Sequence, residues 1–245
     1  AFYLLAMMLP EGMESAWVEA FSKGLAEDQQ LFGVTLAGGD TITTKGPFSA
    51  SLTAMGTVPH GKALLRRDAK PGDRIYVSGT LGDSALGLAL LPDRLHVALS
   101  PAQRLWLKER YLLPQPRLAL GQALVGLAHA CMDVSDGLVQ DLHHICKASK
   151  VGAVIHRKRL PLSDAAASVV VADEVWWLAP LSGGDDYELL FTVPQALHAD
   201  VEALAEALAL PLTAIGDIVA GDGVLVQDEH GMDVTPARQG YSHST

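Results

Sequence analysis

Hydrophobic and polar positions along the chain follow two different periods, which predict a mixture of strands and helices. The segment 48–55 alternates apolar and polar residues, as is typical of a strand with one exposed face. The segment 14–30 instead repeats Trp17, Phe21 and Leu25 at intervals of four, which predicts an amphipathic helix. Both kinds of segment recur along the chain, so we expect an α/β protein.

A polar, turn-rich stretch from Pro59 to Asp73 predicts a domain boundary. We place the two domains at residues 1–66 and 67–245. Asp83 is expected to cap the helix that it begins, and a hairpin is expected around residues 228–231. Further strands are predicted at 1–10, 34–37, 74–78, 151–156, 189–193, 212–219 and 224–226, and further helices at 83–91, 102–113, 117–127, 138–148, 162–172 and 194–209.

The stretch His129–Leu138 predicts a strand, an acidic turn and the start of a helix. Asp133 and Ser135 are two residues apart and so face the same side of an extended strand, and Asp136 follows. Carboxylates and a hydroxyl at such a junction suit a hard cation and the phosphate oxygens that it carries. The alternative is that Ser135 or Asp136 only caps the helix.

Glycine and aspartate follow a short apolar strand at two other places. Gly38-Gly39-Asp40 follows the predicted strand 34–37, and Ser182-Gly183-Gly184-Asp185-Asp186-Tyr187-Glu188 precedes the strand 189–193. Glycine lets the backbone approach a ligand closely, although a simple turn is the alternative for so short a motif. Three carboxylates in four residues at 185–188 cost free energy unless water or cations neutralise them.

Composition excludes several classes of protein. Of the 245 residues 49% are hydrophobic and 19% are charged, and the net charge is −10, which argues against a nucleic-acid surface. No apolar stretch reaches the length of a membrane-spanning helix. The two cysteines, Cys131 and Cys146, show neither metal-binding spacing nor a disulfide framework, which favours a cytoplasmic protein.

Familiar catalytic motifs are absent from the sequence. It contains no P-loop, no dinucleotide-binding glycine motif and no protein-kinase signature, and Ser135 lies in no nucleophile elbow. His129, His143 and His144 lack the spacing of a zinc site. The remaining candidate chemistry is a set of aspartates beside glycines at strand ends, which suits magnesium-bound polyphosphate.

Four motifs together resemble a known family. The motifs, in chain order, are Leu-Ala-Gly-Gly-Asp-Thr at 36–41, Lys-Pro-Gly-Asp-Arg-Ile-Tyr-Val-Ser-Gly at 70–79, Asp-Val-Ser-Asp-Gly-Leu at 133–138 and Ser-Gly-Gly-Asp-Asp-Tyr-Glu-Leu at 182–189. With these motifs the chain resembles thiamine-monophosphate kinase, in the superfamily that includes aminoimidazole ribonucleotide synthetase.

The resemblance implies a PurM-like, two-domain α+β fold with mixed sheets and helices packed on one side. It implies a homodimer formed through N-terminal domains that bind ATP and Mg²⁺, with the site in a cleft at the subunit boundary. The implied reaction is ATP-dependent phosphorylation of thiamine phosphate to thiamine diphosphate, with Mg²⁺ as cofactor. The implied ligands are Asp40, Asp133 and Asp136 for magnesium, Gly39, Asp40, Arg66 and Ser135 for ATP, and Asp185 and Tyr241 for the thiamine phosphate.

The implied chemistry needs no catalytic side chain. The nucleophile is a phosphate oxygen that is already anionic at neutral pH, so no general base is required and no covalent phosphoenzyme is expected. The obstacle is the repulsion between two anions, which magnesium held by aspartates offsets. Other ATP-binding members of the superfamily, a magnesium-dependent phosphatase and an inactive nucleotide-binding fragment stay open as alternatives.

The chain departs from the family pattern at three places. Asp185 stands where the family usually has glutamate, and Ile42 stands where a second threonine is common. The acidic motifs that begin the family and bind most of the magnesium are missing before the strand at 1–10. We therefore expect a fragment whose N-terminal domain is incomplete and which by itself has little or no activity.

Overall fold

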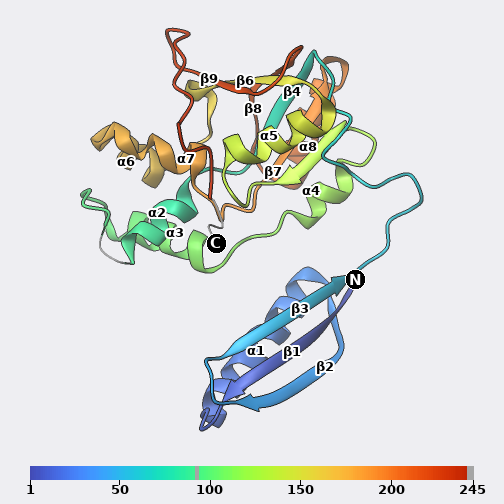
Figure 1. The fold of residues 1–245 in the computed structure, drawn as a ribbon, viewed down its shortest axis with the longest axis vertical. Coiled ribbons are helices and arrows are strands. Elements are labelled where there is room, and N and C mark those ends of the chain that lie inside the picture. Colours follow the sequence, from blue (N-terminus) through green and yellow to red (C-terminus); the bar gives the residue numbers. More distant parts are fainter. Residues whose placement is uncertain (92–93, 242–245) are drawn as a thin grey trace. The chain divides into compact units, whose positions relative to one another are not determined.

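The computed structural model describes residues 1–91 and 94–241 and divides into two compact units (Figure 1). Unit 1 comprises Ala1–Ala63 and unit 2 comprises Leu64–Thr245. The division falls within the polar stretch 59–73, where turns replace regular structure.

Unit 1 is a three-stranded sheet with one helix. Its strands lie in the order β2-β1-β3, with β1 parallel to β2 and antiparallel to β3. Leu5 in β1 lies opposite Gly39, and a Cβ on Gly39 would lie 1.8 Å from the Leu5 carbonyl oxygen. The predicted end of β2 at residue 37 is therefore wrong, because the glycines let the strand continue beside β1. The elements are β1 (Phe2–Pro10), α1 (Ser15–Phe32), β2 (Thr35–Thr44) and β3 (Ser49–Met55).

Aromatic side chains attach α1 to the sheet of unit 1. Trp17 and Phe21 stack with ring centroids 5.3 Å apart, and both rings meet Phe48 edge-on at 4.9 and 5.8 Å. Since side chains alternate along a strand, the buried Tyr3 and Leu5 mark one face of β1. The opposite face is exposed and apolar; its large side chains are Phe2, Leu4, Met8 and Ile42.

Unit 2 is built on a six-stranded sheet in the order β5-β7-β4-β8-β6-β9. Every pair of neighbouring strands is antiparallel except β6 and β9, which are parallel. The elements are β4 (Asp73–Ser78), β5 (Ala130–Asp133), β6 (Gly152–His156), β7 (Leu189–Pro194), β8 (Leu212–Val219) and β9 (Val224–Gln227).

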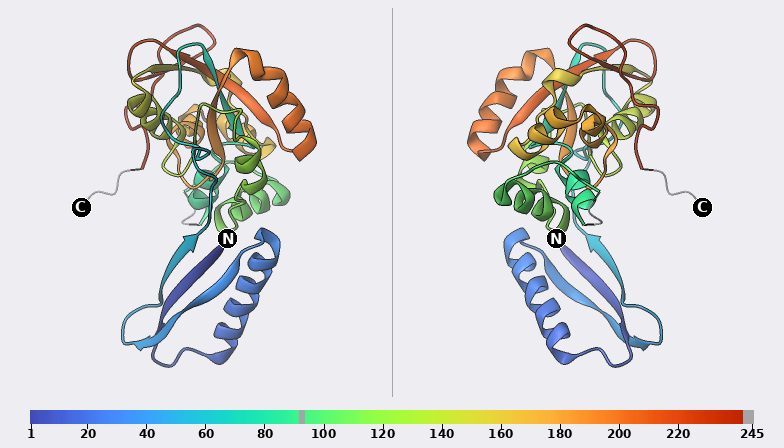
Figure 2. Two further views of the ribbon diagram at one scale, coloured as in Figure 1. Left: turned by 90° about the vertical axis from the view of Figure 1, so that its right-hand side faces the viewer. Right: turned by 90° about the vertical axis from the view of Figure 1, so that its left-hand side faces the viewer.

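Helices cover both faces of this sheet, as Figure 2 shows for α5 (Leu138–Ser149) and α8 (His198–Leu208). Ile75 and Val77 of β4 pack in the cluster that contains the buried side of α5. Tyr76, which points the other way, packs with Phe191 and with side chains of α4 (Leu118–Ala123) and α8. The mixed α/β class is confirmed. The prediction of helices packed on one side of a sheet fits unit 1. In unit 2 the central strands are apolar on both faces, so helices cover both faces of the sheet.

A group of helices packs together beside the sheet of unit 2 (Figure 1). Leu86, Leu107 and Val169 are fully buried and form the centre of this helical cluster. Within residues 1–91 and 94–241, no helix is both long enough and apolar enough to cross a membrane. The remaining helices are α2 (Asp83–Leu90), α3 (Pro101–Leu112), α4 (Leu118–Ala123), α6 (Asp164–Ala172), α7 (Leu178–Ser182) and the 3-10 helices η1 (Arg157–Arg159), η2 (Glu174–Trp177) and η3 (Gln195–Leu197).

Some predicted element boundaries are wrong. The predicted helix 117–127 shortens to α4, and the predicted helix 194–209 begins only at His198, because a 3-10 turn precedes it. The chain does turn back on itself around 228–231 as expected, because Gln227 and Asp233 form an antiparallel bridge and the Val234 N–H donates to the Val226 carbonyl at 2.9 Å. Within residues 94–241 no second strand follows β9, however, and the regular pairing of β9 is the parallel one with β6.

Candidate functional site

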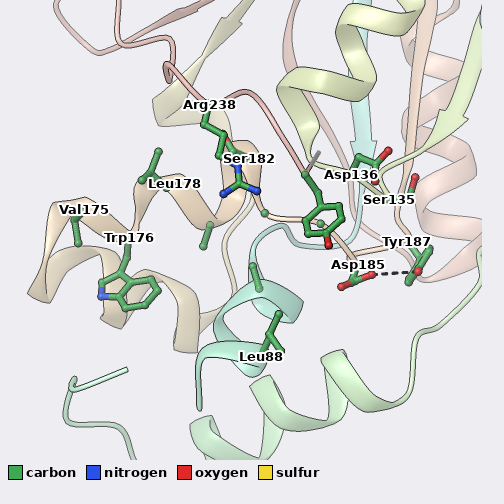
Figure 3. A pocket seen from close by; sticks show the side chains of 15 residues that line it. Leu88, Ser135, Asp136, Val175, Trp176, Leu178, Ser182, Asp185, Tyr187 and Arg238 are labelled. Atoms are coloured by element: carbon green, nitrogen blue, oxygen red, sulfur yellow. Dashed lines mark hydrogen bonds between the residues drawn. The ribbon is translucent and has the colours of Figure 1, made fainter. Parts of the chain in front are cut away.

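A pocket of about 800 Å³ opens in unit 2 where four segments meet (Figure 3). The segments are α2, the loop from β5 to α5, the stretch from η2 to β7 and the chain before residue 242. Fifteen residues line the pocket: Ala85, Leu88, Ser135, Asp136, Val175, Trp176, Leu178, Ala179, Ser182, Gly183, Gly184, Asp185, Tyr187, Arg238 and Tyr241.

A buried carboxylate organises the loop from β5 to α5. Oδ2 of Asp141 accepts hydrogen bonds from the backbone N–H groups of Ser135, Asp136 and Gly137 at 3.0, 3.1 and 3.2 Å. The helix has Gly137 at its N-cap without a side-chain cap. The alternative that Ser135 or Asp136 only caps α5 is therefore wrong, because Asp141 reaches back from the first turn. The side chains of Ser135 and Asp136 line the pocket instead.

Asp141 is 1% exposed, and this burial raises the pKa of its carboxyl to about 6, against the opposing effect of the three N–H groups. Three convergent backbone N–H groups form a natural anion site. Here the protein's own carboxylate occupies it, so the loop cannot offer these three groups to a phosphate.

The motif at 182–189 interlocks with this loop. The Asp185 N–H donates to the Ser135 carbonyl at 2.9 Å, and the Tyr187 N–H donates to the Val134 carbonyl at 2.8 Å. A Cβ on Gly184 would lie 2.5 Å from the Ser135 carbonyl oxygen, which only glycine avoids. Asp185 and Tyr187 both have left-handed backbones, with φ of 67° and 51°. Such strain is common at functional sites.

Glu188 lies in an ionic network rather than in water. Its carboxylate is fully buried and accepts from Arg110 Nη2 at 2.9 Å, from Arg117 Nε at 2.7 Å and from Ser78 Oγ at 2.6 Å. Two guanidinium groups therefore neutralise this acidic side chain.

Asp186 is also buried, at the start of α2. Its carboxyl accepts the backbone N–H groups of Gly82 at 2.7 Å and Ser84 at 3.3 Å, while burial raises its pKa to about 8. Of the three carboxylates of this motif, only Asp185 lines the pocket. Water or cations were expected to neutralise all three carboxylates, but protein groups hydrogen-bond Asp186 and Glu188.

Asp83 does not cap α2 with its side chain, contrary to expectation. Its carboxylate accepts from Thr80 Oγ1 at 2.6 Å, Trp106 Nε1 at 3.0 Å and Ser163 Oγ at 2.5 Å. Since Trp106 belongs to α3 and Ser163 precedes α6, the buried Asp83 ties three helices together.

Negative charge gathers around Tyr187 at one end of the pocket. The Tyr187 hydroxyl donates to Asp185 Oδ1 at 3.2 Å, drawn as a dashed line in Figure 3. Burial, then the charge of Asp185, and then those of Asp133 and Asp136 raise the Tyr187 pKa. Three carboxylates therefore act on one phenol, although Asp133 itself is exposed at the end of β5.

These oxygen donors fit magnesium in a limited way. In the described parts of the chain, no group of three or more His, Cys, Asp or Glu side chains is arranged to hold a metal ion. Magnesium is usually held by one or two carboxylates, and waters and substrate phosphates complete its shell. Asp133 and Asp136 suit that kind of site.

His129, for which no zinc site was expected, pairs through Nδ1 with Asp73 Oδ2 at 2.8 Å.

The chain before residue 242 is fastened to α5. The Tyr241 N–H donates to the Asp136 carbonyl at 2.8 Å, and the Gln140 N–H donates to the Gln239 carbonyl at 3.1 Å. Gln140 Nε2 also donates to the Tyr241 carbonyl at 3.0 Å. These bonds bring Tyr241 and Arg238 into the lining of the pocket.

The structure brings four of the predicted site residues together. Ser135, Asp136, Asp185 and Tyr241 line one pocket, and Asp133 contributes its charge there. Their roles in binding metal, ATP or substrate stay predictions.

The other predicted residues are not among the fifteen that line this pocket. Arg66 is exposed and is not among the fifteen lining residues; its carbonyl accepts from Ser149 Oγ at 3.4 Å. Gly39 and Asp40 belong to β2 of unit 1. Asp40 is exposed, and its Oδ1 accepts the N–H of Thr41 at 2.9 Å.

Both parts of the chain match known family profiles. Residues 1–58 match the AIR synthase related protein, N-terminal domain, and residues 70–229 match the AIR synthase related protein, C-terminal domain. Over 243 residues the chain is 45% identical to thiamine-monophosphate kinase of Escherichia coli, covering 99% of this chain and 73% of that protein. The chain belongs to the thiamine-monophosphate kinase family.

Further members of this family agree. Thiamine-monophosphate kinase of Caulobacter vibrioides is 42% identical, with 98% of this chain and 68% of that protein covered. The crystal structure of the Stenotrophomonas maltophilia kinase has a TM-score of 0.85 at 43% identity, over 92% of this chain and 71% of the other. AaThiL complexed with AMPPCP and TMP has a TM-score of 0.79 at 31% identity, over 99% and 73%.

A structure outside the family shares the fold. Escherichia coli HypE, a hydrogenase maturation protein, has a TM-score of 0.79 at 21% identity, over 100% of this chain and 74% of that chain. At this identity the likeness shows the fold alone.

The sequence did not reveal the two arginines that bind Glu188 of the motif at 182–189. Arg110 follows the buried Leu107 by three positions, which places both on the inner side of α3. That spacing is the one signal that could have indicated a buried charge. Arg117, outside any helix, gave no comparable signal.

Proposed function

We propose that the protein phosphorylates thiamine phosphate to thiamine diphosphate with ATP, by direct in-line transfer assisted by Mg²⁺. The observation that supports this best is the pocket in which the family's two loop motifs meet, with Ser135, Asp136 and Asp185 in its lining. A relative, AaThiL, has been solved with AMPPCP and TMP, which correspond to an ATP analogue and the substrate of this reaction.

We propose binding roles for residues in both parts of the chain. Residues 1–66 serve as the ATP- and Mg²⁺-binding dimerisation domain, and residues 67–245 form the C-terminal domain. Asp40, Asp133 and Asp136 are the proposed magnesium ligands, Gly39, Asp40, Arg66 and Ser135 the proposed ATP contacts, and Asp185 and Tyr241 the proposed contacts of thiamine phosphate.

The pocket's own residues bind and orient rather than transfer protons. The phosphate oxygen of the substrate is anionic at neutral pH, so it attacks without a base. The raised pKa keeps the Tyr187 phenol protonated, and it donates to Asp185 and so fixes the orientation of that carboxylate. When bound at Asp133 and Asp136, magnesium would neutralise phosphoryl charge and reduce the repulsion between the two reactants.

We propose that a second copy of the chain covers the exposed face of unit 1. Phe2, Leu4, Met8 and Ile42 are each 42–50% exposed on one side of a sheet. Exposed apolar patches of this kind are typical of interfaces, and a homodimer commonly uses the same patch on both copies. Replacing Met8 by Lys should shift the mass measured by sedimentation from dimer to monomer, whereas an unchanged mass contradicts this interface.

A cytoplasmic location is proposed from the thiols. Cys131 and Cys146 are free and buried, and burial raises their pKa values to about 12 and about 11. Such thiols are inert and fit a reducing compartment.

The deciding experiment compares products with and without ATP. The chain is incubated with thiamine phosphate and Mg²⁺, and thiamine, thiamine diphosphate, ADP and phosphate are separated by chromatography. Thiamine diphosphate and ADP in equal amounts, lost on adding EDTA, support the proposal and contradict the expectation that the chain by itself has little or no activity. Thiamine and phosphate formed without ATP indicate a phosphatase, and ATP binding without turnover indicates a nucleotide-binding fragment.

Direct transfer has its own test. After incubation with γ-labelled ATP and Mg²⁺, the denatured protein should carry no label, because no side chain is required as nucleophile. A stoichiometric labelled protein would contradict direct transfer while leaving the overall reaction in place.

A further inference from the structure

The pocket of unit 2 has two chemically different ends (Figure 3). One end carries the two carboxylates Asp136 and Asp185 together with hydroxyl groups. The other end is apolar and belongs to η2, α7 and α2. Its side chains are Val175, Trp176, Leu178 and Leu88, with Val175, Leu178 and Leu88 exposed by 58, 49 and 45%.

Trp176 and its neighbour Trp177 have different surroundings. Trp176 is half-buried, lines the pocket and packs against the helical cluster around Leu107 and Val169. Trp177 lies outside that lining and packs against the core under α5, and the Arg157 guanidinium lies 5.1 Å from its ring centroid. The two adjacent residues therefore differ in access to the pocket, which makes Trp177 a matched control.

We infer that Trp176 forms the side of a specificity subsite for the aromatic pyrimidine ring of thiamine phosphate, with the phosphate at the acidic end. This inference rests on the proposed function. An uncharged aromatic ring gains from stacking or edge contact with tryptophan and from burying the exposed side chains of Val175 and Leu178. The positively charged thiazolium then lies on the side of Asp185.

The reverse orientation is electrostatically poor at the apolar end. It would place a phosphate dianion among Val175, Leu178 and Leu88, and burying an unpaired charge is costly. Arg238 is the one cation among the fifteen lining residues, and Figure 3 shows it between the two ends. Its Nε donates to the Gly240 carbonyl at 3.2 Å, which directs this side of the guanidinium toward the chain itself.

The test compares two ligands that differ only by the pyrimidine end. Calorimetric Kd values are measured, with Mg²⁺ present, for thiamine phosphate and for its phosphorylated thiazole half. The wild type is compared with Trp176→Ala and with the control Trp177→Ala. Trp176→Ala should raise the Kd of thiamine phosphate about ten-fold and that of the thiazole phosphate less than about two-fold, since aromatic contacts contribute on this scale. Trp177→Ala should change the ratio of the two Kd values less than about two-fold.

Two further variants guard against misfolding. Trp176→Leu keeps an apolar side chain in the helical cluster, and Val175→Ser changes an exposed residue. Both variants should selectively weaken the binding of thiamine phosphate, with the smaller effect in Val175→Ser. Equal losses for both ligands, or no loss with any of the three variants that alter the apolar end, overturn the inference. A selective loss of the thiazole phosphate in Arg238→Gln, with no selectivity in Trp176→Ala, supports the reverse orientation. If the wild type binds neither ligand, the proposed function itself fails.

Discussion

The tripeptide Gly-Gly-Asp occurs twice in this chain, in two very different settings. At 38–40 it lies within the edge strand β2 of unit 1, and at 183–185 it lies in the loop before β7 of unit 2. In both places a glycine meets a neighbouring backbone. A Cβ would lie 1.8 Å from the Leu5 carbonyl oxygen at Gly39, and 2.5 Å from the Ser135 carbonyl oxygen at Gly184.

The aspartates that follow are treated differently. Asp40 is exposed and its carboxylate accepts the N–H of the next residue, whereas Asp185 has a left-handed backbone and accepts from the Tyr187 hydroxyl. In the same motif, the buried Asp186 and Glu188 anchor the loop to the sheet and to the helices. The tripeptide thus specifies close backbone approach, and its surroundings decide whether the carboxylate is rigidly placed.

The strongest expected effect comes from removing the anchor of the second motif. Glu188→Ala should lower the free energy of unfolding of unit 2 by about 3–5 kcal/mol, because it leaves two arginines without their buried partner. Urea unfolding followed by tryptophan fluorescence measures this loss. Glu109→Ala, on the exposed side of α3, is the control and should change stability by less than about 0.5 kcal/mol. Equal effects of the two variants would show that the network adds nothing.

The next effect is a pH dependence that belongs to Asp141. Its folded-state pKa of about 6 lies above the ordinary value, so its contribution to stability is complete below about pH 4 and is lost as the pH rises through about 6. Relative to Asp141→Asn, the wild type should therefore lose about 2–3 kcal/mol of unfolding free energy between pH 4 and pH 7.5. Asp186 titrates in both proteins and cancels in the difference. A pH-independent difference would refute the raised pKa.

A smaller effect tests the two glycines directly. Gly184→Ala and Gly39→Ala should each cost about 1–3 kcal/mol, since the added methyl group overlaps a backbone carbonyl. The losses should fall in different units, so hydrogen exchange should rise around β5 and β7 in the first variant and in β1 and β2 in the second. Exchange that rises in the same segments in both variants would contradict the division into units.

The smallest stability effect is expected at Asp40. Asp40→Asn should change the unfolding free energy by less than about 0.5 kcal/mol, because the side chain is exposed and keeps an acceptor for the Thr41 N–H. If Asp40 is a magnesium and ATP ligand as proposed, the same variant should weaken Mg²⁺-ATP binding at least about ten-fold in calorimetry. Unchanged ATP binding would remove Asp40 from the proposed ligand set.

Local patterns predicted much of this fold. The strand, acidic turn and helix at 129–148 were predicted from apolar spacing and are present as β5 and α5, and β8 has the predicted bounds. Local patterns also pointed to Ser135, Asp136 and Asp185, which line the pocket together. The assignment of Tyr241 came from family resemblance rather than from spacing.

The errors arise where distant residues replace a local interaction. A helix cap was expected from Asp83, but Asp186, more than a hundred positions later, accepts the N–H groups at that helix start. Asp141 similarly replaced the expected caps of α5. β2 was expected to end at residue 37, yet pairing with β1 carries it through the glycines. Each outcome depends on which segments meet in space, and periodicity does not encode that.

The interlock between the loop at 134–137 and the motif at 182–188 has a practical consequence for engineering. Backbone atoms of each segment occupy the space that a side chain would need at a glycine of the other segment. Neither segment can therefore be exchanged alone. Chimeras built from two relatives should remain soluble when both segments come from one parent, and should lose substrate affinity when the parents are mixed. The two segments should therefore be exchanged together as one unit, although more than forty residues separate them in the sequence.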